Sequence, residues 1–178
     1  MTAPCWTVGF AGLLAAIAAA APAAAQTSAG LPGGANSLQE TFENWTVACV
    51  LQDAVKRCAL SQQQTDQQSH QRVLAIELNT FSADKADGVL VLPFGLALDS
   101  GVTLQVDDAP AGPTLRFRTC LPVGCVVPLS FDGKFVSTLR KGGALKVNAF
   151  ADGGKDAAFT ISLKGFPAAL DRTTALAK

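Results

Sequence analysis

The sequence predicts a mainly β protein, an antiparallel β-sandwich or barrel-like domain with one or two short helices. Apolar and polar side chains alternate in many short stretches, as expected for strands that bury one face. Gly, Pro, Asp and Ser mark turns between these stretches at the spacing typical of all-β domains. Helical spacing of apolar residues is strong in only one segment. These observations favour packed antiparallel sheets over a helical or α/β fold.

The N-terminal segment has the composition of an export signal. Residues 1–26 contain no charged side chain, and residues 8–21 are almost wholly Ala, Leu, Ile, Val and Gly. This run is too short to span a bilayer comfortably, and Ala23 and Ala25 supply the small side chains that signal peptidase requires. We therefore predict a signal peptide over residues 1–25. A retained anchor is the alternative, because no Lys or Arg precedes the apolar run. Cys5 does not indicate a lipoprotein, because it precedes the apolar run and a lipid-attachment cysteine follows it.

The rest of the chain predicts one domain after a short leader. Residues 27–38 are rich in Gly, Ser, Pro and Asn, with little to bury, so residues 26–41 are expected to form a flexible leader. Order is expected to begin near Phe42. Residues 42–178 are then a single sandwich-like domain, long enough to bury a core.

Charge argues against a nucleic-acid partner, and hydropathy argues against a transmembrane segment in the mature chain. All 14 acidic and 14 basic residues follow the signal peptide and balance, so no net field favours nucleic acid or an anionic membrane. The most apolar later run, residues 89–98, is interrupted by Pro93 and Gly95 and is too short to cross a bilayer. We expect no nucleic-acid partner and no transmembrane segment after signal cleavage.

The first predicted strands form a hairpin followed by a polar loop. Trp45, Val47 and Cys49 share one strand face, and a returning strand begins at Cys58. The Gln-rich segment 61–71 is expected to be a loop, with frayed strand ends as the alternative, because nothing in it would anchor to a core. Strands are then predicted over residues 72–78, 102–106, 115–119 and 126–129, and the apolar run 89–98 is expected to be a core strand followed by a bend.

The C-terminal third predicts a short helix, two strands and a helical tail. Asp132 is expected to cap a helix whose apolar stripe is Phe135, Val136 and Leu139, and which Gly142 ends. Strands over residues 145–149 and 159–163 close the domain. A short helical tail is expected over residues 164–177, beginning at Pro167.

Four cysteines follow the signal peptide, which predicts two disulfides in an oxidising compartment. Cys49, Cys58, Cys120 and Cys125 allow three connectivities, and short loops favour Cys49 with Cys58 and Cys120 with Cys125. A redox-active Cys120–Cys125 pair is the alternative to a structural one. The spacing is C-x4-C, not the C-x2-C of thiol-disulfide enzymes, which favours the structural role.

The sequence predicts no catalytic, metal or cofactor site. The only histidine, His70, lies in the Gln-rich segment with no packed neighbours to orient it, and the chain has no tyrosine. A metal site would have to use the disulfide cysteines. The paired acids stand in turns, where Asp is common for local hydrogen bonds. We therefore expect a protein that is not an enzyme.

Two groups of residues are candidates for partner binding. Arg116 and Arg118 project from one face of their predicted strand and, together with Lys146, would suit an anionic partner; a solvated sheet face is the alternative. Leu92 and Phe94 are candidates for an exposed apolar patch, with a core strand and bend as the alternative.

Several motifs together resemble one bacterial family. They are WTVxC at 45–49, GVLVLPFGLAL at 88–98, GVTLQVD at 101–107, RFRTCLPxGC at 116–125, LRKG at 139–142 and SLKGF at 162–166. In this order they resemble the invasion-associated locus B family over about residues 45–171. The resemblance implies a Gram-negative envelope protein with a signal peptide, a β-sandwich-like domain and the cysteine pairs above. The family is associated with host-cell invasion, has no established enzymatic activity and supplies no ligand residues.

The expected function is therefore interaction at the cell envelope. We expect a periplasmic binding protein, with outer-membrane association or secretion as alternative locations. Its partner is an unidentified protein or envelope component. The expected role is support of host-cell invasion or envelope integrity. A thiol-disulfide or other envelope enzyme and a passive structural component are the competing interpretations.

Overall fold

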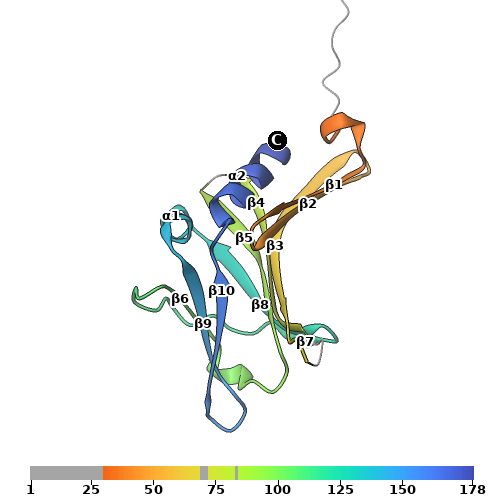
Figure 1. The fold of residues 1–178 in the computed structure, drawn as a ribbon. Helices are drawn as coiled ribbons and strands as arrows, with labels where there is room; N and C mark the ends of the chain where they lie inside the picture. The colour runs from red at the N-terminus through yellow and green to blue at the C-terminus, as the bar shows by residue number, and fades with distance from the viewer. Residues whose placement is uncertain (1–29, 69–71, 83) are drawn as a thin grey trace, which may run out of the picture.

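The protein folds as two antiparallel sheets with two α-helices, as predicted from the alternation. The structure, a computed structural model, describes residues 30–68, 72–82 and 84–178. Within them, one sheet has seven strands in the order β1-β2-β3-β4-β5-β8-β7 and the other has three in the order β10-β9-β6 (Figure 1). The predicted signal peptide and His70 lie outside the described residues.

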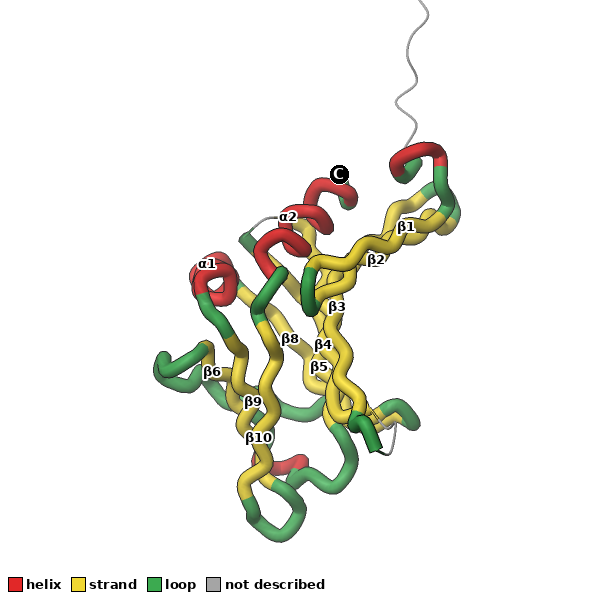
Figure 2. The backbone as a smooth tube through the Cα atoms, in the orientation of Figure 1, coloured by secondary structure: helices red, strands yellow, loops and turns green. Residues whose placement is uncertain are grey.

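Most elements follow one another with short connections, and residues 107–118 form a longer one between β6 and β7 (Figure 2). The strands of the larger sheet are β1 Ser37–Phe42, β2 Trp45–Gln52, β3 Val55–Thr65, β4 Arg72–Ser82, β5 Lys85–Leu92, β7 Thr119–Leu121 and β8 Gly124–Phe131. The smaller sheet contains β6 Thr103–Val106, β9 Ala144–Phe150 and β10 Asp156–Ser162. The helices are α1 Gly133–Lys141 and α2 Phe166–Leu176, and short 3-10 turns occur at Pro32–Gly34 (η1) and Leu98–Ser100 (η2).

The core is one cluster of apolar side chains from both sheets and both helices. Alternate residues of each strand face inward, and burial of these side chains drives the sheets together. Members with at most 1% exposure include Leu60, Leu74, Ile76, Leu78, Leu90, Val127, Leu145, Val147 and Ile161. Apart from Leu90 and Val127, these lie at strand positions for which the alternation predicted a shared face.

Helix α2 is part of the core, not a peripheral tail. It begins at Phe166, with Pro167 in its first turn, and it packs against β1 to β4. Phe166, Ala169 and Leu170 are fully buried, and the Phe166 ring contacts Trp45 edge-on with centroids 5.1 Å apart. None of the helices in the described residues has the length and hydropathy to cross a membrane.

Helix α1 forms as the sequence predicted. The Asp132 carboxylate accepts a hydrogen bond of 2.8 Å from the Phe135 N–H, which caps the first turn. Gly142 ends the helix, and Val136 and Leu139 are buried. The half-buried Phe135 ring packs on Phe131 with centroids 4.8 Å apart.

The flexible leader predicted over residues 26–41 is wrong for its second half. Residues 37–42 form β1, which pairs with β2 from Ser37 opposite Val50 to Phe42 opposite Trp45. Leu31, ahead of this strand, is 3% exposed. The strand was not evident from its composition because much of its stabilisation comes from pairing with β2 and contact with α2, which are not local in sequence.

The loop predicted over residues 61–71 is also wrong in part, since β3 continues to Thr65. Gln62 is 7% exposed. Its side-chain amide donates to the Ser162 carbonyl at 2.9 Å and its amide oxygen accepts from the Ser162 N–H at 3.2 Å. A polar side chain can be buried when its hydrogen bonds are satisfied, so this glutamine does anchor to the domain.

The strand predicted over residues 115–119 is mostly an extended connection. Leu115 forms an isolated bridge with Val102, and β7 begins only at Thr119. The connection passes from the smaller sheet to the larger one, so it does not pair with one strand along its length (Figure 2). The alternation nevertheless persists: Arg116 and Arg118 are exposed, and Phe117 is half-buried against the core.

Candidate interaction surface

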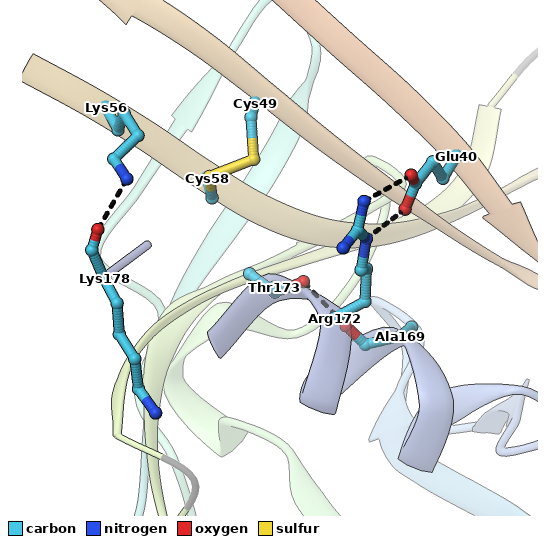
Figure 3. The surroundings of a disulfide bond; sticks show 8 residues. All are labelled: Glu40, Cys49, Lys56, Cys58, Ala169, Arg172, Thr173 and Lys178. Carbon is cyan, nitrogen blue, oxygen red and sulfur yellow. Dashed lines mark hydrogen bonds and ion pairs between the residues drawn. A yellow bond between two sulfur atoms is a disulfide. The ribbon is translucent and has the colours of Figure 1, made fainter. Parts of the chain in front are cut away.

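The two disulfides join neighbouring strands at directly opposite residues. Cys49 of β2 is bonded to Cys58 of β3, with Cα atoms 4.1 Å apart (Figure 3). Cys120 of β7 is bonded to Cys125 of β8, with Cα atoms 3.9 Å apart. This is the pairing that short loops favoured. The first disulfide is buried, whereas Cys120 is exposed.

Five large exposed apolar side chains lie on segments near one end of the molecule, which we call the apolar end. Its members are Phe94 (61% exposed), Leu98 (43%), Leu121 (48%), Val123 (54%) and Phe150 (45%). The other large apolar side chains exposed in the described residues are Val50 and Val55, on the β2–β3 hairpin. Surface apolar residues are common singly, but concentration at one end is typical of an interaction site.

Backbone contacts bring the segments of the apolar end together. Leu92, the last residue of β5, pairs with Cys125, so the chain leaves β5 beside the turn that contains Leu121 and Val123. The Ala97 N–H then donates to the Phe150 carbonyl at 2.8 Å. In Figure 1 these connections lie at the lower end of the molecule, near η2 and β7.

The structure separates the two apolar residues that the sequence proposed for binding. Leu92 is 1% exposed and belongs to the core, so its assignment to a binding patch is wrong. Strand alternation turns Leu90 and Leu92 inward. Pro93 then interrupts the strand, and Gly95 adopts a left-handed conformation with φ of 85°, so the bend carries Phe94 to the surface.

The three basic candidates do not form one cluster. Arg116 and Arg118 lie on the connection between the sheets, and the Arg118 N–H donates to the Val126 carbonyl at 2.8 Å, beside the cysteine turn. Neither arginine has an ion-pair partner among the described residues. Lys146 lies on β9 nearer α1 and is already paired with Asp108 at 3.1 Å. The apolar end is therefore flanked by two arginines and not by three basic residues.

The sequence did not identify the other members of the apolar end, although it contained a signal for some of them. Leu121 and Val123 stand inside a tight cysteine turn, where polar residues are usual. Phe150 follows Leu145, Val147 and Ala149, and its position in the alternation assigns it to the outer face. Leu98 gave no comparable signal, because its exposure depends on the η2 turn.

Two shallow grooves lie outside the apolar end. One of about 470 Å³ is lined by neutral groups, chiefly Asn44, Gln62, Gln63, Gln64, Thr160 and Ser162. The other, of about 400 Å³, lies between α1 and the turn after β6, with Asp107, Asp108 and Lys141 in its wall. No group of three or more His, Cys, Asp or Glu residues in the described chain is placed to hold a metal ion.

The strongest charged contact is structural and lies between β1 and α2. Arg172 donates to both carboxylate oxygens of Glu40, at 2.6 and 2.8 Å (Figure 3). These hydrogen bonds hold the pKa of Glu40 below its ordinary value and raise the pKa of Arg172. The pair fixes the helix to the edge strand and is not part of either groove.

Comparison with known proteins identifies the family. The family model described as Invasion associated locus B (IalB) protein matches residues 45–174. An invasion protein B homolog of Brucella abortus (strain 2308) is 50% identical over 152 residues, covering 85% of this chain and 87% of the relative. Invasion protein B of Bartonella bacilliformis is 38% identical over 162 residues, covering 88% and 86%.

A solved structure gives the same result for the fold. The crystal structure of invasion associated protein B from Bartonella henselae superposes with a TM-score of 0.73 at 33% sequence identity. The match covers 78% of this chain and 96% of that one. The sequence and the fold agree, and the chain belongs to the invasion-associated locus B family.

Proposed function

We propose that this protein is an exported interaction protein of the bacterial envelope, which binds a protein partner through its apolar end and catalyses no reaction. The observation that carries the proposal is the presence, at one end, of exposed Phe, Leu and Val side chains near Arg116 and Arg118, which have no ion-pair partner among the described residues. Aromatic residues and arginine are enriched where protein partners bind, and they contribute much of the binding energy there.

The proposed location is the periplasm, with release from the cell or attachment to the outer membrane as further destinations. Two features support export. The composition of residues 1–25 matches a cleavable signal peptide. The two disulfides suit an oxidising compartment, since cytoplasmic thiols are kept reduced.

The biological role that we propose is support of host-cell invasion or of envelope integrity. The proposal draws on the relatives, which are named invasion protein B or its homologs. Both roles require contact with another component, and a two-sheet domain with exposed apolar side chains at one end is suited to provide it.

A complementation experiment tests the role and the surface together. A strain lacking the gene is complemented with the wild-type protein, with a Phe94→Ser and Phe150→Ser double variant, or with a Val50→Ser and Val55→Ser control. Host-cell entry and detergent sensitivity are measured, with osmotic-shock fractionation to locate the protein. We expect the wild type and control to restore the phenotype and the Phe94 and Phe150 variant to fail. Equal activity of the two double variants would contradict the proposal.

A further inference from the structure

Strand β10 forms one edge of the smaller sheet, and it differs from the other sheet edges in that no described residue protects half of its length. The backbone of residues 112–115 lies along β6, where Gly112 N–H donates to the Leu104 carbonyl at 2.8 Å. Strand β7 has only three residues, and β1 carries the inward charge of Glu40. Short strands, inward charges and covering segments are the usual means of protecting an edge.

The half of β10 nearer α2 is closed by side chains of the larger sheet. Gln62 bonds both the N–H and the carbonyl of Ser162, and Trp45 Nε1 donates to the same carbonyl at 2.9 Å. Gln64 then donates to the Thr160 carbonyl at 2.7 Å. These amide and indole groups replace the backbone of a neighbouring strand, and the last of these bonds is at Thr160.

The other half of β10 presents backbone groups outward. Leu163 N–H donates to the Gly143 carbonyl. The backbone N–H and carbonyl groups of alternate residues, from 163 back to 157, therefore point toward β9. The backbone of Asp156 and Ala158 and the N–H of Thr160 therefore face away from the sheet. No hydrogen bond from the described residues reaches these outward groups, and all three residues are exposed.

The inner face of β10 is open over the same half. Ile161 is fully buried, whereas Phe159 and Ala157, which point inward from the same strand, are only half-buried. The sheets thus cover the inner side chains completely only where the glutamine bonds join them. An added strand would place its own inward side chains beside Phe159 and Ala157 and bury apolar surface.

We propose that residues 156–160 of β10 bind an extended peptide segment of a partner by strand addition, with apolar side chains at alternate positions. Outward N–H and carbonyl groups repeated every second residue are complementary to another extended backbone. The edge has no proline, lysine or bulge to prevent pairing. Asp156 is its one charged residue, so a lysine at the adjoining end of the peptide adds charge complementarity. The inference goes beyond the apolar end and involves different residues.

The test uses a short soluble peptide of alternating valine and threonine with lysine at both ends. It is added to the disulfide-bonded protein labelled for NMR, and backbone amide shifts and hydrogen exchange are followed. The amides of Ala158 and Thr160 are expected to shift and to exchange more slowly. The same peptide N-methylated on alternate residues is expected to bind at least about tenfold more weakly, since its hydrogen-bonding edge is blocked.

Proline substitutions give a matched pair of variants. Ala158→Pro removes an outward N–H, which an edge strand tolerates, so the protein is expected to fold and to bind the peptide at least about tenfold more weakly. Ala157→Pro removes an N–H that points to β9 and is expected to lower the unfolding temperature. If Ala158→Pro does not fold, its N–H is not outward and the proposal is overturned.

Three further results would overturn the proposal: no binding at the highest soluble peptide concentration, equal binding of the N-methylated peptide, or shifts confined to residues outside β10. Shifts at Phe94 and Phe150 alone would indicate binding at the apolar end. Such a result would support the proposed function while rejecting strand addition. If the peptide binds at β10 but the Phe94→Ser variant retains full biological activity, strand addition is supported and the proposed role of the apolar end is rejected.

Discussion

At the scale of single residues, Gln62 shows how a polar side chain can join two sheets. Its amide supplies both a donor and an acceptor to the backbone of Ser162, so it acts as a short piece of neighbouring strand. The exposed Gln63 next to it makes no such bond. The two adjacent glutamines thus provide a matched comparison of a structural and a surface amide.

We predict that Gln62→Leu lowers the free energy of unfolding by about 1 to 2 kcal/mol, because it leaves the Ser162 N–H without a partner. The Ser162 carbonyl keeps its bond from Trp45. Gln63→Leu is the control and is expected to change stability by less than about 0.5 kcal/mol. Urea denaturation measures both, and equal effects of the two substitutions would show that the glutamine bonds to β10 contribute nothing.

Gly165 supports a second prediction at this scale. It has φ of 83°, and an added Cβ would collide with the Phe42 carbonyl, so both conformation and space require glycine. Gly153 has φ of 101° but open space around its Cβ position. We expect Gly165→Ala to lower the thermal unfolding temperature clearly more than Gly153→Ala. A shift for Gly165→Ala no larger than the control would argue against close packing of α2 on β1.

The sequence predicted single residues well where their partners are local. Asp132 caps the turn that immediately follows it, and the disulfide partners are separated by nine and five positions. It failed for Leu92, because an apolar run does not reveal at which residue the chain turns outward. The exposure of Phe94 depends on the bend that begins at Pro93.

At the scale of elements, we predict that the contact of α2 with β1 contributes to stability in a pH-dependent way. The pKa of Glu40 is lowered in the folded protein by its hydrogen bonds from Arg172, so the ionised carboxylate favours folding. This contribution is complete above the ordinary carboxyl pKa of 4.5 and is lost as pH falls through the lower folded value. We predict that wild type exceeds Glu40→Gln in unfolding temperature at neutral pH and that the difference shrinks below about pH 4.5.

Thermal melts at a series of pH values measure this difference. Glu43→Gln is the control, since Glu43 is exposed in the turn after β1 and has no ion pair among the described residues. Its effect is expected to vary less with pH. A Glu40→Gln difference that stays constant into the acid range would contradict the assignment of the contribution to the ionised pair.

The two disulfides are predicted to differ in their rate of reduction. A reducing thiolate must reach a sulfur atom, and Cys120 is exposed whereas Cys49 and Cys58 are 1% and 8% exposed. We expect a mild reductant to open Cys120–Cys125 first while the fold persists. Alkylation of new thiols followed by peptide mass spectrometry measures the order, and earlier reduction of Cys49–Cys58 would contradict it.

The sequence predicted the elements with clear alternation and missed those held by distant contacts. Strands β4 and β9 and helix α1 carry their own apolar pattern, so local spacing was sufficient. Strand β1 depends on β2 and α2, and the end of β3 depends on bonds to β10 about 100 residues away. No local pattern records such contacts.

At the scale of the whole molecule, the contacts that hold α2 to the larger sheet and the exposed side chains of the apolar end lie toward opposite ends (Figure 1). Helix α2, the Glu40 pair and the buried disulfide join β1, β2 and β3 to the rest of the core. The apolar end consists of strand ends, loops and turns that carry large side chains without covering them. The sequence predicted this surface only through Phe94 and the two arginines, since the other members come from segments that meet only in the folded protein.

The most direct test of the account is site-specific photo-crosslinking in intact cells of the source organism. A photoreactive residue is placed at Phe94 or at Val123 of the apolar end, with the same residue at Val55 on the β2–β3 hairpin as the control. Adducts are resolved by mass and identified. The account predicts the same protein partner from Phe94 and Val123 and none from Val55. Adducts from Val55 alone, or no adduct from either apolar-end position, would contradict it.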